Sequence, residues 1–224
     1  MVVAKTREQI EKMREAGRVL ARTLALVREM IEPGVSTLAL DRAAEDYIRV
    51  HGGIPTFKGY QGFPGTLCTS INEEVVHGIP SDRELKEGDI ISVDCGITLN
   101  GFISDSAFTA AAGKISSRLE DLVKCTEESL HRAISKAKVG NRLGTVSHAV
   151  ESHVLPRGYG IVRDYCGHGV GINLHEEPQI PNYGRAGAGP VIGNGWTLAI
   201  EPMINLGGDD VMTLDDNWTA ITTE

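Results

Sequence analysis

Residues 89–105 read DIISVDCGITLNGFISD, and this stretch decides the fold. The apolar run over residues 89–93 predicts a buried strand that ends at Asp94. The dipeptide Asn100–Gly101 is typical of a tight β-hairpin, because both residues tolerate a positive φ. A second strand then leads to Asp105. Two strands joined by this turn place the carboxylates of Asp94 and Asp105 side by side.

A further acid ends a second apolar run, where Glu201 follows residues 196–200. A buried carboxylate must be paired, protonated or bound to a metal ion. His168 lies in the glycine-rich stretch 166–171, where small residues let the backbone approach an ion or a substrate closely. Three carboxylates and one imidazole suit a divalent ion of the manganese, iron or cobalt kind. Together with Asp94 and Asp105, these residues predict a metal-dependent hydrolase.

Simpler interpretations exist for each of these residues taken singly. A lone aspartate after a strand is more often a turn or cap residue than a metal ligand. The glycine-rich stretch around His168 is also compatible with phosphate binding, but it has neither the dinucleotide-binding pattern nor the Lys-Ser/Thr pair of a P-loop. The combination of three acids with one histidine favours the metal site.

Hydrophobic periodicity predicts two pairs of helices. The first helix begins at a capping box formed by Thr6 and Gln9, and Ser117 with Glu120 forms a similar pattern at the start of the third. Glycine or proline follows each helix. The predicted helices span residues 6–33, 37–51, 117–140 and 143–155.

Landmark residues recur at a nearly constant offset, which predicts a duplicated chain. Two glycine pairs are 106 residues apart, Asp94 precedes Glu201 by 107, and His77 and His175 each open a His-x-x-Pro tetrad. We therefore expect an α+β fold of two similar halves that face each other across a shared cleft. The halves are residues 6–113 and 114–224. Chance is the alternative, because any α+β chain contains several glycines.

Composition indicates one compact domain. The chain has 224 residues, 41% of them hydrophobic, which is enough for a single core. The formal net charge of −8 disfavours contact with nucleic acid phosphates. No apolar run reaches the roughly 20 residues of a membrane span, and the N-terminus has no signal-peptide core. Four widely spaced cysteines indicate a reducing compartment, so we expect a cytoplasmic protein without membrane contact.

Six motifs resemble those of type I methionine aminopeptidases, the short bacterial form in peptidase family M24. They follow the family order over nearly the whole chain: SINE at 70–73 with HGIP at 77–80, GDI at 88–90 leading to Asp94, GF at 101–102 with Asp105, YCGHG at 165–169, HEEP at 175–178 and IEPM at 200–203. The resemblance implies a single metallopeptidase catalytic domain with the pita-bread fold, in which two pseudo-symmetric halves combine antiparallel sheet with flanking helices. It also implies removal of the initiator methionine from nascent proteins by metal-dependent hydrolysis.

The resemblance further implies roles for individual residues. Two divalent ions, of cobalt, manganese, iron(II) or zinc, would be held by Asp94, Asp105, His168 and Glu201. Glu201 would also take a proton during attack on the scissile carbonyl, and His77 and His175 would hydrogen-bond the peptide and stabilise the tetrahedral intermediate. The methionine side chain would lie among Phe57, Tyr60, Phe63, Cys68, Leu174 and Trp218. Ordinary core packing is the alternative for these pocket residues.

One departure from the family concerns the second ion. The family has a further glutamate ligand on a C-terminal strand, and this sequence stops before such a strand. Glu224 follows Trp218 too closely to replace that ligand. Three carboxylates carry −3 against about +4 for two divalent ions. Either the sequence is truncated or disordered at this point, or the site is incomplete. In the 224-residue form we expect the second ion to bind weakly.

Two other functions compete with this one. A related pita-bread peptidase, such as a proline dipeptidase, usually has a further N-terminal domain, whereas the capped helix here begins at Thr6. A non-catalytic binding protein of the same fold would have no need of the metal ligands and the two histidines. For partners, the resemblance implies nascent polypeptides that begin with methionine, transient contact with the ribosome, and a monomeric enzyme.

Overall fold

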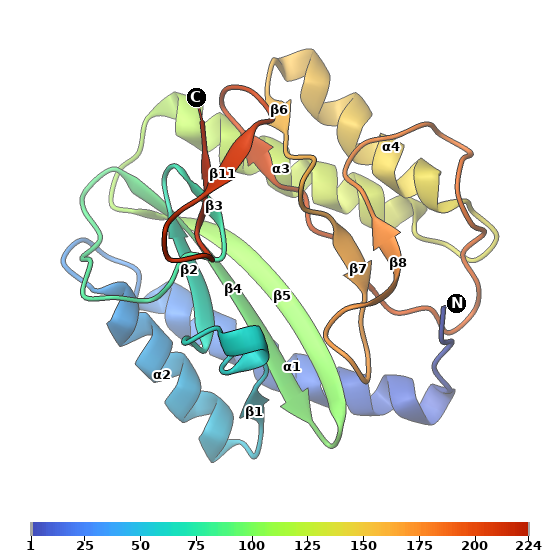
Figure 1. The fold of residues 1–224 in the computed structure, drawn as a ribbon, viewed down its shortest axis with the longest axis horizontal. Coiled ribbons are helices and arrows are strands. Elements are labelled where there is room, and N and C mark those ends of the chain that lie inside the picture. Colours follow the sequence, from blue (N-terminus) through green and yellow to red (C-terminus); the bar gives the residue numbers. More distant parts are fainter. Residues whose placement is uncertain (1, 224) are drawn as a thin grey trace.

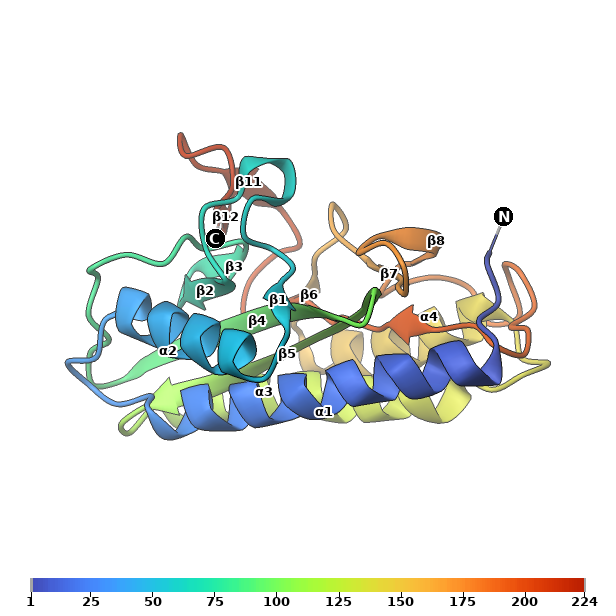
Figure 2. The ribbon, with the colours of Figure 1, turned by 90° about the horizontal axis from the view of Figure 1, so that it is seen from below.

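In the computed structural model, which describes residues 2–223, helices form one layer and small antiparallel sheets form the other (Figures 1 and 2). The helices are α1 (Arg7–Glu29), α2 (Thr37–Val50), α3 (Ser117–Lys136) and α4 (Leu143–Val154), with short 3-10 turns η1 (Tyr60–Gly62) and η2 (Leu155–Arg157). The strands are β1 (Ile54–Pro55), β2 (Leu67–Ile71), β3 (Glu74–Val76), β4 (Asp89–Leu99), β5 (Phe102–Ala112), β6 (Gly160–Ile161), β7 (Gly167–Gly169), β8 (Glu176–Ile180), β9 (Leu198–Ala199), β10 (Ile204–Asn205), β11 (Val211–Thr213) and β12 (Ala220–Thr222). This architecture confirms the predicted α+β class.

The helices begin close to their predicted positions. Thr6 Oγ1 accepts a hydrogen bond from Gln9 N at 3.2 Å, and Gln9 Oε1 accepts one from Thr6 N at 2.8 Å, which confirms the capping box. The prediction that Ser117 caps α3 is wrong, because Ser116 is the N-cap and its side chain accepts a hydrogen bond from Leu119 N. Ser116 has an extended backbone and the helix already includes Ser117, so the cap lies one residue earlier. α1 and α3 also end at Glu29 and Lys136, before the predicted stops near 33 and 140.

The long hairpin of β4 and β5 forms the centre of the sheet layer (Figure 1). Leu99 pairs with Phe102, and the turn between them consists of Asn100 and Gly101 with φ values of 52° and 78°. Positive φ at both central residues is the requirement of the tight hairpin turn that the sequence predicts. β4 also pairs with β1 and β2, which lie on the edge opposite β5.

Asp94 lies in the middle of β4, so the prediction that the strand ends there is wrong. One face of β4 is fully buried against α1 and α2 and consists of Ile91, Val93, Cys95 and Ile97. Because side chains alternate along a strand, Asp94 projects from the other face without interrupting the core. Asp94 is opposite Ala107, and Asp105 is opposite Gly96. The two acids are therefore diagonal neighbours on one face, which agrees with the expected side-by-side placement.

Glu201 follows a much shorter strand than the sequence predicts. β9 covers only Leu198 and Ala199, and it pairs with β7 so that Ala199 is opposite His168. Glu201 lies two residues beyond β9, where its backbone carbonyl accepts a hydrogen bond of 2.6 Å from Asn182 Nδ2. This hydrogen bond from Asn182 anchors the irregular segment after β9 near His168.

The hydrophobic core has a cluster under each pair of helices and a third cluster between them. The first includes Leu40 and Ile91, and the second includes Val146 and Ile180. The third joins residues of both halves and contains pocket residues described below. Within the described residues 2–223, no helix is long and apolar enough to cross a membrane.

Paired glycines have matching backbone angles in the two halves. Gly34 and Gly140 have φ values of 94° and 91°, and Gly52 and Gly158 have values of 76° and 79°. Each glycine lies in the segment after a helix, at the equivalent place in its half. A residue with a side chain would have a strained backbone at these positive φ values. The match supports our proposal that the halves arose by duplication.

Candidate metal centre and substrate cavity

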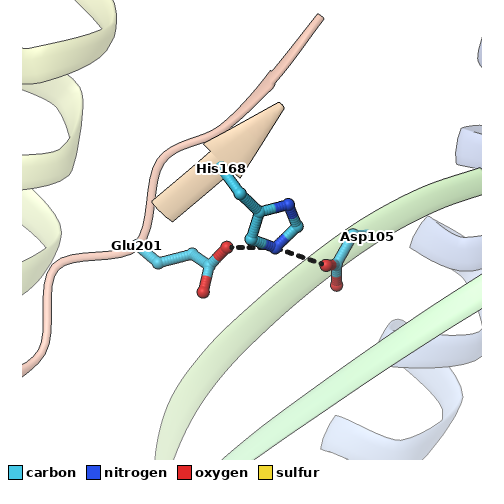
Figure 3. A group of neighbouring side chains, drawn as sticks. All are labelled: Asp105, His168 and Glu201. Atoms are coloured by element: carbon cyan, nitrogen blue, oxygen red, sulfur yellow. Dashed lines mark ion pairs between the residues drawn. The ribbon is translucent and has the colours of Figure 1, made fainter. Parts of the chain in front are cut away.

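Three predicted ligands converge from separate elements. Asp105 comes from β5, His168 from β7 and Glu201 from the segment after β9, and Figure 3 shows both carboxylates directed at one imidazole nitrogen. His168 Nε2 lies 3.1 Å from Glu201 Oε1 and 3.5 Å from Asp105 Oδ2. One donor atom from each residue lies within 4.8 Å of the others, a spacing that a single metal ion can bridge. The side chains of Asp105 and His168 are 8% and 10% exposed.

Asp94 lies beside this group but is not one of the three mutually close residues. Its carboxyl is close enough to Asp105 and Glu201 to feel the negative charge of both side chains. Burial, together with these two negative charges, raises the pKa of Asp94 well above its usual value. Burial likewise raises the pKa of Glu201, and the charge of Asp105 adds to that effect while His168 opposes it. The acids therefore repel one another in the absence of a cation.

His168 is oriented as a ligand through Nε2. Its Nδ1 lies 2.8 Å from the carbonyl oxygen of Gly169, so a proton on Nδ1 is donated to the backbone and the Nε2 lone pair faces the acids. Burial lowers the pKa of His168, but hydrogen bonds to Asp105 and Glu201 outweigh burial and raise it to about 10. Without a metal ion, the imidazole thus holds a proton in the position that a cation would occupy.

These residues fit a divalent metal ion. Apart from its contact with His168 Nε2, the buried Glu201 Oε1 has no hydrogen-bond partner among the described residues, and the Glu201 side chain as a whole is 34% exposed. Carboxylate oxygens and an imidazole nitrogen are donors for manganese, iron, cobalt or zinc ions. A divalent cation at this point would satisfy Glu201 Oε1 and relieve the repulsion between the acids.

The glycines on either side of His168 allow the neighbouring strands to pack closely. A side chain at Gly167 would come within 2.4 Å of the Ala199 carbonyl oxygen, and one at Gly169 within 2.2 Å of the Glu177 carbonyl oxygen. The absence of side chains therefore lets β8 and β9 approach β7 closely. The expectation that these glycines make room for an ion or a substrate is wrong, because neighbouring strands fill that space.

A cavity of about 310 Å³ opens beside the acids and His168. Every site residue predicted from the sequence lines it: Phe57, Tyr60, Phe63, Cys68, His77, Asp94, Asp105, His168, Leu174, His175, Glu201 and Trp218. Residues from both halves contribute to the wall. The cavity is therefore the shared cleft that the duplicated sequence leads us to expect.

His77 and His175 lie on the cavity wall, one from each half. The Tyr60 hydroxyl is 2.9 Å from His175 Nδ1, and the ring centroid of His175 is 4.4 Å from that of His168. Burial lowers the pKa of His77, with a smaller contribution from His175, and burial followed by the charge of His168 lowers the pKa of His175. Both imidazoles are therefore neutral near pH 7, where each can donate one hydrogen bond.

Part of the cavity wall is apolar. Phe57, Phe63 and Leu174 are 7%, 3% and 5% exposed, and the Phe63 ring packs edge-on against Trp218 with centroids 5.1 Å apart. Gly96 leaves room for the Phe57 ring, because a side chain at Gly96 would come within 2.6 Å of that ring.

Cys68 adds a thiol to this wall, in register with Asp94 on β4. Burial, followed by the charges of Asp94 and Asp105, raises the pKa of the Cys68 thiol well above its usual value. A thiol that stays protonated is a poor nucleophile. Cys68 therefore contributes apolar surface and does not make the cavity a cysteine-hydrolase site.

The cavity also contains residues that sequence reasoning did not assign to it. They are Gln61, Val76, Tyr165, Cys166 and Met203. Tyr165 packs edge-on against His77 with ring centroids 5.3 Å apart. Tyr165 and Cys166 directly precede the Gly-His-Gly motif, and Met203 closely follows Glu201, so proximity to the predicted ligands was the available signal.

Comparisons with known proteins agree with this geometry. The model of metallopeptidase family M24 matches residues 11–222. The methionine aminopeptidase of Clostridium acetobutylicum is 51% identical over 225 residues, covering 100% of this chain and 90% of the relative. The crystal structure of methionine aminopeptidase from Thermotoga maritima is similar with a TM-score of 0.98 at 44% identity, covering 100% of this chain and 90% of that one. The prolidase from Pyrococcus horikoshii, at a TM-score of 0.75 and 20% identity, covers 99% of this chain and 59% of its own and shares the fold.

Replacing His168 with alanine will lower the affinity of the metal-free protein for Mn²⁺ at least about tenfold, because Nε2 is removed from the centre of the donor group. Isothermal titration calorimetry measures the effect. His131→Ala is the matched control, since His131 is 71% exposed on α3 and lies outside the cavity. Equal affinities for the His168→Ala protein and its parent would contradict a ligand role.

Proposed function

We propose that this chain, which belongs to metallopeptidase family M24, removes the N-terminal methionine from proteins and peptides by metal-dependent hydrolysis. The full-length similarity to methionine aminopeptidases supports this activity and confirms the predicted pita-bread fold. The observation that carries the proposal is the composition of the cavity. An acidic donor group for metal ions and an apolar pocket share one space of about 310 Å³, and its wall also carries one neutral histidine from each half.

The apolar pocket suits a methionine side chain. A thioether is unbranched, flexible and polarisable, and it makes favourable contacts with aromatic edges. Phe57, Phe63 and Trp218 provide such edges, while Leu174 and Cys68 narrow the space with small or flexible groups. We propose that these side chains bind the methionine and place the first peptide bond near the acids.

The two histidines are proposed to bind the peptide carbonyl. When the Tyr60 hydroxyl donates to His175 Nδ1, the ring carries its proton on Nε2, from which it can be donated to a carbonyl oxygen. His77 has φ of 61°, a strained value for a residue with a side chain, and it is held by rings of Tyr165 and Trp218. Donors fixed in advance stabilise the charge that develops on the carbonyl oxygen.

Metal ions bound to the acids would supply Lewis-acid polarisation and activation of water. We propose that Asp94, Asp105, His168 and Glu201 hold two such ions, of cobalt, manganese, iron(II) or zinc. Glu201 is the proposed acceptor of the proton that the attacking water loses, because its carboxylate lies in the donor group and burial raises its pKa. Its proton can pass to the leaving amine as the peptide bond breaks.

We further propose that the natural substrates are nascent chains, met in the cytoplasm by a monomeric enzyme in transient contact with the ribosome. Four free cysteines support a reducing compartment, because Cys68, Cys95, Cys125 and Cys166 form no disulfide with one another. The net charge of −8 disfavours binding to the phosphates of nucleic acids, so we propose no nucleic acid partner.

A proline dipeptidase is the second candidate, since the prolidase from Pyrococcus horikoshii has the same fold. The apolar pocket argues against it, because it fits a long side chain at the first position of the peptide. A non-catalytic binding protein is a weaker candidate, because both histidines and the whole donor group line the cavity.

The chain will release free methionine from a Met-Ala-Ser peptide when Mn²⁺ or Co²⁺ is added, and chelation by EDTA will abolish the release. Chromatographic detection of methionine measures this. An Ala-Pro peptide is the control and will be left intact, because alanine does not fill the pocket. Cleavage of Ala-Pro in preference to Met-Ala-Ser would favour the dipeptidase, and cleavage of neither would favour the binding protein.

Replacing His175 with alanine will lower kcat on Met-Ala-Ser by about 10²- to 10³-fold, the usual loss for one donor to a developing oxyanion. Steady-state kinetics at saturating Mn²⁺ checks this. His148→Ala is the matched control, because His148 is 46% exposed on α4 and outside the cavity. Unchanged turnover in the His175→Ala protein would remove His175 from the mechanism.

This 224-residue chain will bind one divalent ion tightly and a second weakly. Three carboxylates line the described cavity, at Asp94, Asp105 and Glu201, and −3 does not balance about +4. Glu224 lies outside the described residues. Calorimetric titration with Mn²⁺ measures the stoichiometry, and two tight equivalents would contradict the prediction.

A further inference from the structure

A buried ion pair lies beside the cavity and joins two distant parts of the chain. Lys5 Nζ contacts Glu176 Oε2 across 171 residues of sequence, and the two side chains are 2% and 10% exposed. Neither residue lines the cavity. Removing two charges from water is costly, and such pairs often add little to stability. Stability alone therefore does not explain this pair.

Glu176 uses its other oxygen to fold the loop between β7 and β8. Its Oε1 accepts hydrogen bonds from Ile172 N at 2.8 Å and from Asn173 N at 3.0 Å. Gly171 N also donates to the Asn173 carbonyl oxygen at 3.1 Å. One carboxylate thus fixes the backbone of the loop that leads directly to Leu174 and His175.

Lys5 is itself fixed in place. Its Nζ donates to the Val3 carbonyl oxygen at 2.9 Å, and its backbone N donates to the Gly195 carbonyl oxygen at 2.7 Å. The lysine chain also lies against the loop, since a side chain at Gly171 would come within 2.2 Å of Lys5 Cε. The segment before α1 is therefore packed against the loop between β7 and β8.

The loop held in this way carries two side chains of the proposed site. Leu174 is 5% exposed in the apolar wall, and His175 meets Tyr60 and His168. We propose that Lys5 and Glu176 are positioning residues: their ion pair holds the loop 171–175 so that His175 and Leu174 point into the cavity. This inference rests on the proposed function for its catalytic consequence, but its structural part stands alone.

Lys5→Met tests the structural part in the metal-free protein, because methionine keeps most of the chain length and removes the charge. Hydrogen–deuterium exchange followed by mass spectrometry will show amides of residues 171–176 exchanging about tenfold faster, with exchange in α3 unchanged. Lys138→Met, an exposed lysine beyond α3, is the matched control and will change neither region. Unchanged exchange in 171–176, or equal acceleration in α3, would overturn the proposal.

Glu176→Gln provides a second variant in case Lys5→Met fails to fold. Glutamine keeps an acceptor for Ile172 N and Asn173 N but loses the charge that faces Lys5, so the same loop will exchange faster. A variant that exchanges like the parent would overturn the proposal in the same way.

Kinetics then tests the catalytic part. Lys5→Met will lower kcat on Met-Ala-Ser about tenfold in the parent and less than about twofold in a His175→Ala background, because it acts through His175. Equal losses in the two backgrounds would overturn the link to His175. A parent without activity in any metal would refute the proposed function, while the exchange result would still decide whether the ion pair holds the loop.

Discussion

Repulsion between three acidic side chains around one buried point is the constraint on which this structure depends. Asp94, Asp105 and Glu201 face the same cavity, and burial with mutual repulsion raises the pKa of Asp94 well above its usual value. A fold can hold such a group only if a proton or a cation is available to it. His168 provides the proton in the metal-free protein, which is why its pKa rises to about 10. The acidic group therefore requires a cation that is not one of the protein's own side chains for its charge to be balanced.

Each half of the chain contributes two residues to this site. A long, regular hairpin brings Asp94 and Asp105 from the first half, and its other face is buried against α1 and α2. Short strands and irregular segments bring His168 and Glu201 from the second. The regular half gives a rigid base for two carboxylates, whereas the irregular half needs local supports such as Asn182 on the Glu201 backbone. Precision in a site of this kind depends on those supports.

Much of the fold could be predicted from local sequence signals, because caps, periodicity and turn dipeptides act within a few residues. The Asn100–Gly101 turn and the Thr6 capping box belong to this class. The apolar residues and the two histidines of the cavity were predicted instead from the resemblance to a known family. The end of β4 was predicted wrongly because an acid after an apolar run resembles a strand end. The three-dimensional structure shows that Asp94 faces a cavity, while the residues on either side of it in β4 lie in the core.

Contacts between residues far apart in sequence were beyond prediction for a physical reason. Nothing in the local pattern around Lys5 distinguishes it from any lysine before a helix, and Glu176 has the same type as its neighbour Glu177. Their pairing depends on how the start of the chain passes the β7–β8 loop in the folded protein. A buried charge pair needs both partners in good geometry, because removing either one leaves an uncompensated buried charge, and we propose that this requirement specifies one arrangement of the loop. The arrangement of this loop sets the position of the proposed catalytic residue His175, because His175 directly precedes Glu176.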